Sequence, residues 1–85
     1  MGFEFETTIE ANQRGFVFVI LPEKIARDFP SKGMIPVCVK INSYDFEIDL
    51  QATKKEHKFF ISKKMLQTAN LDNGDEVSIS ISMKG

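Results

Sequence analysis

The sequence predicts a mainly β fold: a small closed or split barrel of about six strands, with two short helices and an internal pseudo-two-fold repeat. Three observations predict it. Apolar and polar residues alternate with period two over several segments, as they do in half-buried strands. The same pattern occurs twice along the chain. The chain has 85 residues, of which 42% are hydrophobic, which suits one core in a single domain spanning residues 1–85.

The repeat is visible when the sequence is moved over itself by 41 residues. Residues 2–33 then lie on residues 43–74 without a gap and share six identities in 32 positions, against about two expected from average residue usage. This offset predicts repeat 1 over about residues 2–41 and repeat 2 over about residues 43–83. The identical pairs are Phe5–Phe46, Glu6–Glu47, Ala11–Ala52, Phe18–Phe59, Ile20–Ile61 and Gly33–Gly74.

Within each repeat the first strand alternates apolar and polar residues. Residues 3–10 form this strand in the first repeat, and residues 44–50 are its copy. The inner face of the first strand is predicted to carry Phe3, Phe5, Thr7 and Ile9.

The second strand of the first repeat, residues 16–21, is apolar on both faces, which favours a central strand covered on both sides. Its copy, residues 58–61, is shorter. The third strands are residues 35–41 and 77–83, and the two-residue turn Asn42-Ser43 joins the repeats around a shared core. Six strands have many edges, and closing the sheet removes them.

A short helix follows the second strand of each repeat. Pro22 is predicted as the first residue of the first helix, because a missing N–H costs nothing there, and Pro30 ends that helix. In the second repeat Ser62 is the expected N-cap and Asn70 the residue that closes the helix. The turns into the third strands are predicted at Gly33 and Gly74.

Composition and charge limit the classes of function. The single cysteine, Cys38, excludes an intrachain disulfide and a zinc site built from several cysteines, and it is typical of a reducing compartment. No apolar run approaches the ~18–20 residues of a membrane span. Residues 1–6 lack the basic and apolar regions of a signal peptide. We therefore expect a cytoplasmic protein without membrane contact.

The sequence resembles two known families. The run from Ile61-Ser62-Lys63-Lys64-Met65-Leu66 through Leu71-Asp72-Asn73-Gly74-Asp75-Glu76-Val77 resembles the strand–helix–GD-x-V–strand signature of AbrB/MazE-type transcription factors. Over nearly the whole chain the pattern is similar to a bacterial and archaeal family, domain of unknown function nineteen-oh-five. The matching features are Phe18-Val19-Ile20-Leu21-Pro22, Val37-Cys38-Val39-Lys40-Ile41-Asn42, Phe46, Leu50, His57, Lys63 with Leu66, and Gly74-Asp75-Glu76-Val77.

This resemblance implies a double-split β-barrel with no established activity. In AbrB-like proteins two chains each donate one half of the barrel. Here both halves would lie in one chain, so we expect a monomer to suffice. Some members of the unknown-function family carry a second domain of the bacteriocin-protection, YdeI-like type downstream. A partner domain of that type acting in trans stays an open alternative.

No constellation of residues predicts catalysis, a metal site or a cofactor. His57 is the only histidine and has no visible orienting partner, so we expect an exposed or partly packed side chain at the start of a strand. Cys38 is expected to be a small, half-buried apolar residue, because Lys40 is only a weak source of thiol activation. Rows of carboxylates on outer strand faces are typical of the outside of a barrel; they comprise Glu4, Glu6, Glu10, Asp45, Glu47 and Asp49.

The one asymmetric feature is a basic segment, residues 54–64, which holds five lysines and one glutamate in a chain of net charge −1. Arg14 is the copy-equivalent of Lys55 and is expected across the pseudo-axis from it. Lys63 and Lys64 lie at a predicted helix N-terminus, whose free N–H groups favour anions. A solvated, solubilising loop is the simpler explanation. The candidate ligand- or anion-binding residues are Lys54, Lys55, His57, Lys58, Lys63, Lys64 and Arg14.

Two functions follow as hypotheses. The favoured one is a non-catalytic interaction module for a protein or small ligand that the sequence does not identify. The alternative is nucleic-acid binding, of the AbrB-like DNA-binding kind, through residues 54–64. The net charge of −1 and a pI of about 5.8 count against this alternative, because DNA-binding domains are usually basic overall. No enzymatic activity is expected.

Overall fold

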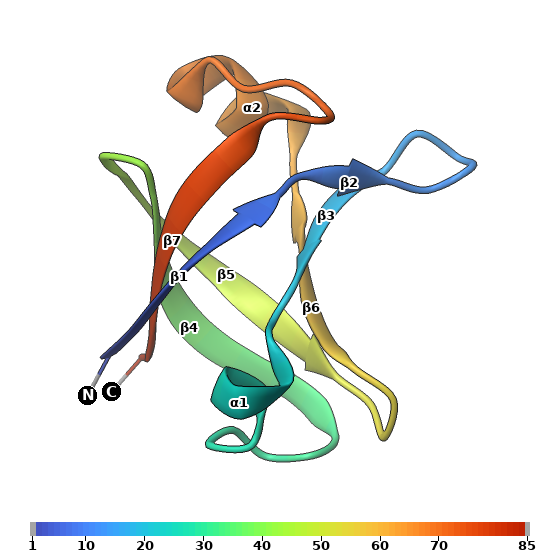
Figure 1. Cartoon of the computed structure of the whole chain (residues 1–85), viewed down its shortest axis with the longest axis vertical. Helices are drawn as coiled ribbons and strands as arrows, with labels where there is room; N and C mark the ends of the chain where they lie inside the picture. Colours follow the sequence, from blue (N-terminus) through green and yellow to red (C-terminus); the bar gives the residue numbers. More distant parts are fainter. Residues whose placement is uncertain (1, 85) are drawn as a thin grey trace.

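The computed structural model describes residues 2–84 and contains one seven-strand antiparallel sheet, curled into a half-barrel, with two short helices (Figure 1). The prediction of a mainly β chain with two short helices is therefore confirmed. The elements are β1 (Gly2–Thr8), β2 (Glu10–Ala11), β3 (Val17–Ile20), α1 (Glu23–Ala26), β4 (Gly33–Ile41), β5 (Tyr44–Ala52), β6 (His57–Ile61), α2 (Lys63–Ala69) and β7 (Glu76–Met83).

The structure has seven strands rather than about six because the first predicted strand is interrupted at Ile9. The sheet order is β1-β7-β4-β5-β6-β3-β2, so the two halves of this interrupted stretch lie at opposite edges of the sheet. Ile9 is buried at the bend. Its N–H donates to the Asp75 carbonyl at 2.9 Å, and its carbonyl accepts from the Gly74 N–H at 3.0 Å. The bend is thus anchored to the loop before β7.

The core lies inside the curl and is built from alternate residues of the strands. Phe59 is the largest fully buried side chain, and Ile9, Leu50 and Ile81 pack in the same cluster. Phe3 is half-buried, with its ring centroid 5.8 Å from that of the buried Phe29. The inner face predicted for the first strand is confirmed, since its apolar residues all contact this core.

The helix caps follow from local chemistry. The Ser62 hydroxyl accepts a hydrogen bond from the Met65 N–H at 3.2 Å, and Asn70 ends α2 in the left-handed conformation, at φ 55° and ψ 53°. Both predicted caps are confirmed. Pro22 is the N-cap residue of α1 instead of its first helical residue, because its extended ψ of 145° keeps it outside the helix.

The prediction of a central strand over residues 16–21, covered on both sides, is wrong. β3 begins at Val17, and Phe16 precedes it with 57% of its surface exposed. Val19 is fully buried, whereas Phe18 and Ile20 on the opposite face are half-exposed. On one side β3 pairs with β6, but on the other it pairs only with the two residues of β2. The strand therefore lies near an edge of the sheet and keeps one apolar face partly open.

The 41-residue offset brings together residues of different burial in one pair of strands. It pairs Phe18 with Phe59, yet Phe18 faces outward and Phe59 is fully buried. Cross-strand register instead sets Val19 opposite Phe59. Residues 21–30 and 61–70, which lie 40 positions apart, have identical patterns of buried, half-buried and exposed positions.

Candidate functional site

Three phenylalanine rings and one lysine gather on the outer face of β3 and β6. Phe60 lies in the middle: its ring centroid is 6.3 Å from that of Phe16 and 6.1 Å from that of Phe18, and both pairs meet at steep angles. The Lys58 Nζ lies 5.5 Å from the Phe18 centroid and 5.4 Å from the Phe60 centroid, within cation–π range. We call Phe16, Phe18, Lys58 and Phe60 the aromatic face.

Strand register explains why these side chains meet. β3 and β6 are antiparallel, with Phe18 opposite Phe60 and Ile20 opposite Lys58. Directly opposite residues of an antiparallel pair share one side of the sheet. Since Val19 and Phe59 between them point into the core, Phe18, Lys58 and Phe60 point out. These three members of the aromatic face follow from the register that buries Phe59, and Phe16 joins them from the loop before β3.

The loop that carries Arg14 and Phe16 is held by one side chain. The Asn12 Oδ1 atom accepts hydrogen bonds from the Arg14 N–H at 2.9 Å and the Phe16 N–H at 3.0 Å. The Asn12 N–H donates in turn to the Phe16 carbonyl at 2.9 Å, and Gly15 supplies the positive φ of 84° that the turn requires. Arg14 and Phe16 are thus presented on a loop with fixed backbone geometry.

The loop before β6 is closed in the same way. The Thr53 Oγ1 atom accepts from the Lys55 N–H at 3.3 Å and the Glu56 N–H at 3.1 Å. Lys55 therefore occupies the same position relative to Thr53 that Arg14 occupies relative to Asn12. Glu56 also places a carboxylate oxygen 3.8 Å from the Lys58 Nζ, so the lysine of the aromatic face is partly neutralised.

The predicted basic residues are distributed along β6 and do not form one cluster. Lys54 and Lys55 precede β6, in the turn at the bottom of Figure 1, whereas Lys63 and Lys64 follow it, in the first turn of α2 at the top. Arg14 lies in the loop between β2 and β3. Of the predicted candidates, Lys58 is the one in contact with the aromatic rings.

His57 is buried and hydrogen-bonded within the fold. Its side chain is buried, with 7% exposed, and its Nε2 atom lies 2.7 Å from the Pro30 carbonyl oxygen. A carbonyl oxygen only accepts hydrogen bonds, so Nε2 carries the proton and donates. The expectation of an exposed or partly packed histidine is wrong. The signal was present in the sequence, because His57 continues the inward row of Phe59 and Ile61 at period two.

Cys38 is half-buried on the outer face of β4, as predicted. Glu47 of β5 and Ser82 of β7 lie opposite it. Between residues 2 and 84 no three histidine, cysteine, aspartate or glutamate side chains are close enough to hold a metal ion together. Neither helix in that range is long and apolar enough to cross a membrane.

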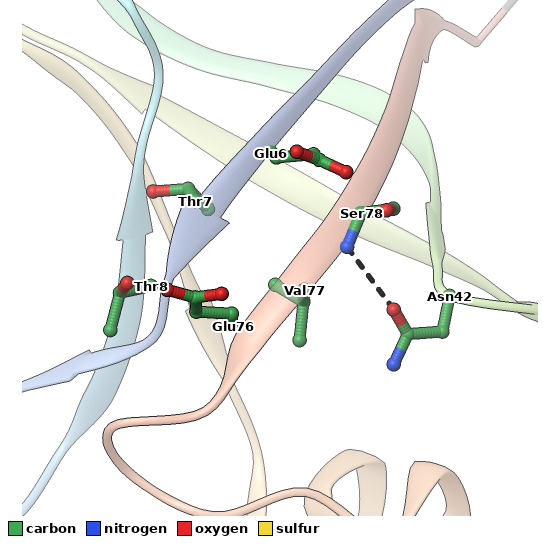
Figure 2. Close-up of a pocket in the computed structure, with 7 residues that line it drawn as sticks. All are labelled: Glu6, Thr7, Thr8, Asn42, Glu76, Val77 and Ser78. Atoms are coloured by element: carbon green, nitrogen blue, oxygen red, sulfur yellow. Dashed lines mark hydrogen bonds between the residues drawn. The ribbon is translucent and has the colours of Figure 1, made fainter.

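A polar hollow of about 380 Å³ lies at the end of β1 and the start of β7, beside the β4–β5 turn (Figure 2). Asn42 from the β4–β5 turn closes one side of it: its Oδ1 accepts from the Ser78 N–H at 3.1 Å, and its N–H donates to the Ser78 carbonyl at 2.8 Å. Sequence reasoning placed Glu6 on an outer row but missed the others, because Asn42 and Ser78 meet only after folding. The lining residues are Glu6, Thr7, Thr8, Asn42, Glu76, Val77 and Ser78.

Comparison of the sequence with protein-family models identifies the family of this chain. A family model described as domain of unknown function (DUF1905) matches residues 5–81. The chain belongs to this family. The match gives no sign of a separate AbrB/MazE-like half. No curated protein matches the chain.

Proposed function

We propose that this DUF1905 domain is a non-catalytic binding module and that the aromatic face is its binding surface. The observation that carries the proposal is the gathering of three adjacent phenylalanines on the outer side of the sheet, with Phe16 57% exposed and Phe18 and Phe60 half-exposed. Contiguous exposed apolar surface is uncommon on soluble domains and marks interaction sites. Aromatic residues are also enriched at such sites relative to the rest of the surface.

The chemistry of the aromatic face supports binding in preference to reaction. It offers ring surfaces and the ammonium group of Lys58, and Arg14 lies two residues before Phe16 in the chain. It contains no nucleophile next to a base and no pair of acid–base groups, which catalysis of group transfer requires. The polar hollow at Asn42 is the weaker candidate, because its two carboxylates, Glu6 and Glu76, would favour only a cationic or polyhydroxylated ligand.

We also propose that the curled sheet is a double-split β-barrel whose two halves are copies of one unit. Supporting this, Val19 faces Phe59 in the β3–β6 pair, and Val39 faces Ile81 in the β4–β7 pair. A two-fold axis that passes between the strands of both pairs would exchange the two halves. Because β3 and β6 flank this axis, the aromatic face that they form together occurs once in the domain. With both halves in one chain, we expect a monomer.

The earlier alternative, AbrB-like DNA binding through residues 54–64, receives less support. Lys55 and Lys63 lie at opposite ends of β6, so the segment does not present its charge as one loop. This distribution of lysines along β6 favours a partner that binds along the aromatic face over a partner that binds to a single basic loop.

Site-specific photocrosslinking in living cells tests the proposed function. The photoreactive residue p-benzoylphenylalanine is placed at position 16 and, as a matched control, at Met83, which is 52% exposed on β7. We expect adducts from position 16 that the Phe60→Ala change reduces, and none above background from position 83. Equal or absent crosslinking at the two positions would refute the proposal.

A further inference from the structure

We infer that the aromatic face stacks the bases of a single-stranded nucleic acid. This inference rests on the proposed function and names the class of its ligand. Single-stranded nucleic acids are bound by aromatic side chains on which successive bases stack, flanked by cationic side chains that follow the phosphates. Both components are present here, with the cations placed before, within and beyond the rings.

The local sequence of β3 provides the first support. Residues 14–21, Arg-Gly-Phe-Val-Phe-Val-Ile-Leu, follow the pattern K/R-G-F/Y-G/A-F-V-x-F/Y of the RNA-binding strand in RNA-recognition motifs, with two departures, at Val17 and Leu21. In those domains the aromatics of this strand and of its neighbour stack two or three bases. The fold here is different, so the likeness concerns only the strand pair.

The structure places the first two aromatic positions of the pattern on the aromatic face. Phe16 is exposed and Phe18 is half-exposed, and Phe60 lies beside them on the neighbouring strand, whereas Leu21 at the last position is buried. Val17, which departs from the pattern, packs partly against the core and lies opposite Ile61. Its larger side chain therefore does not obstruct the face.

Charge complementarity is the second support. The backbone N–H groups of Arg14 and Phe16 are both bound by the Asn12 side chain, and Lys58 lies over two rings. Lys55 and Lys63 extend the positive charge beyond the two ends of β6. A strand of nucleic acid lying along β6 would meet a cation before, between and after the stacking rings.

Two carboxylates oppose this attraction. Glu56 is 3.8 Å from the Lys58 ammonium group, and Glu10 lies opposite Phe18 in the β2–β3 pair. Because both compete with phosphate for the same cations, we expect modest affinity with a shallow dependence on salt. Each phosphate neutralised contributes a slope of about −0.7 in log K against log salt for single strands.

A single tryptophan at position 16 provides a direct test. The chain contains no tryptophan, so Phe16→Trp creates one reporter on the aromatic face. Titration with hexauridylate or hexathymidylate is expected to quench its fluorescence, and labelled hexanucleotides should show raised anisotropy with the unaltered protein. A 12-base-pair duplex and a hexaglutamate peptide should have little effect. Quenching of equal strength by the peptide or the duplex would overturn the inference.

Matched variants separate stacking from simple apolar contact. Phe16→Tyr should retain hexanucleotide affinity, whereas Phe16→Leu should lower it by roughly 5- to 140-fold, the range for loss of one stacked base. Arg14→Gln should reduce the salt slope by about 0.7, while Arg27→Gln, in the exposed end of α1, should leave it unchanged. Equal affinities for the Tyr and Leu variants would overturn the stacking role. Circular dichroism confirms that each variant is folded.

Failure of the inference can be told from failure of the proposed function. If position 16 crosslinks to protein in cells while hexanucleotides leave the tryptophan unquenched, the binding module stands and the nucleic-acid ligand is wrong. Nuclease-sensitive adducts from position 16 would support both. The relative affinities for uridylate and thymidylate then identify RNA or DNA as the source.

Discussion

Replacing His57 tests whether this buried side chain is structural. His57→Ala removes the hydrogen bond to the Pro30 carbonyl and leaves space where the ring packs, at a position that is 7% exposed. One hydrogen bond contributes about 1 kcal/mol net. Truncation of a buried side chain of comparable size typically lowers stability by about 2 kcal/mol or more. We therefore expect the free energy of unfolding to fall by about 2–4 kcal/mol.

The corresponding thermal shift is large for a domain of this size. At about 4–8 °C for each kcal/mol in a domain of 60–100 residues, Tm should fall by roughly 8–32 °C. His57→Gln is the matched control, because a glutamine amide N–H can reach the same carbonyl oxygen. Its loss should be about 1 kcal/mol. Urea and thermal unfolding followed by circular dichroism measure both variants.

The comparison has two results that would refute this reasoning. Equal destabilisation by the Ala and Gln variants would show that the bond to Pro30 contributes nothing. A loss below about 0.5 kcal/mol for His57→Ala, typical of ordinary surface changes, would show that the burial is unimportant. His57→Gln should also leave hexauridylate titration unchanged, because the imidazole points into the core and away from the aromatic face.

Three further predictions concern caps and loops. Ser62→Ala should lower stability by about 1 kcal/mol in urea unfolding, because the Met65 N–H loses its acceptor. Asn70 has a positive φ of 55°, which glycine adopts readily and alanine does not. Asn70→Gly should therefore leave the free energy of unfolding unchanged or raise it, whereas Asn70→Ala should lower it by about 1 kcal/mol. A reversed order would contradict the cap assignment. Asn12→Ala removes the acceptor that holds the loop bearing Arg14 and Phe16, so hexanucleotide binding should weaken several-fold. Tm should change little, because Asn12 is exposed. Unchanged anisotropy titrations would show that binding does not depend on this loop being held.

Most of the fold could be predicted because period-two alternation is a strong local signal. It located the strands and the inner residues of β1, and cap chemistry located both ends of α2. It could not decide the orientation of residues 16–21, since both faces of that segment are apolar. The outward face is selected by the partner strand: only one orientation lets Val19 meet Phe59 inside the core.

The candidate site was only partly predictable for a related reason. Lysine enrichment directed attention to residues 54–64, and Lys58 does belong to the aromatic face. Phe16 and Phe18 were assigned to a covered strand, because apolar residues are by default assumed to be inside. The role of His57 depends on the Pro30 carbonyl, 27 residues away in sequence, which no local pattern reports.

The bend at Ile9 has a consequence for biosynthesis. Residues 2–11 leave the ribosome well before residues 76–83, yet β1 pairs with β7, so Phe3 has no partner strand until Ile81 has been synthesised. Contacts between such distant segments slow folding, because the intervening chain must be ordered first. Until β7 is made, the first strand keeps unpaired backbone groups and exposed phenylalanines, which is the state in which strands pair with the wrong chain. Its alternating glutamates, Glu4 and Glu6, provide like-charge repulsion between nascent copies during that interval.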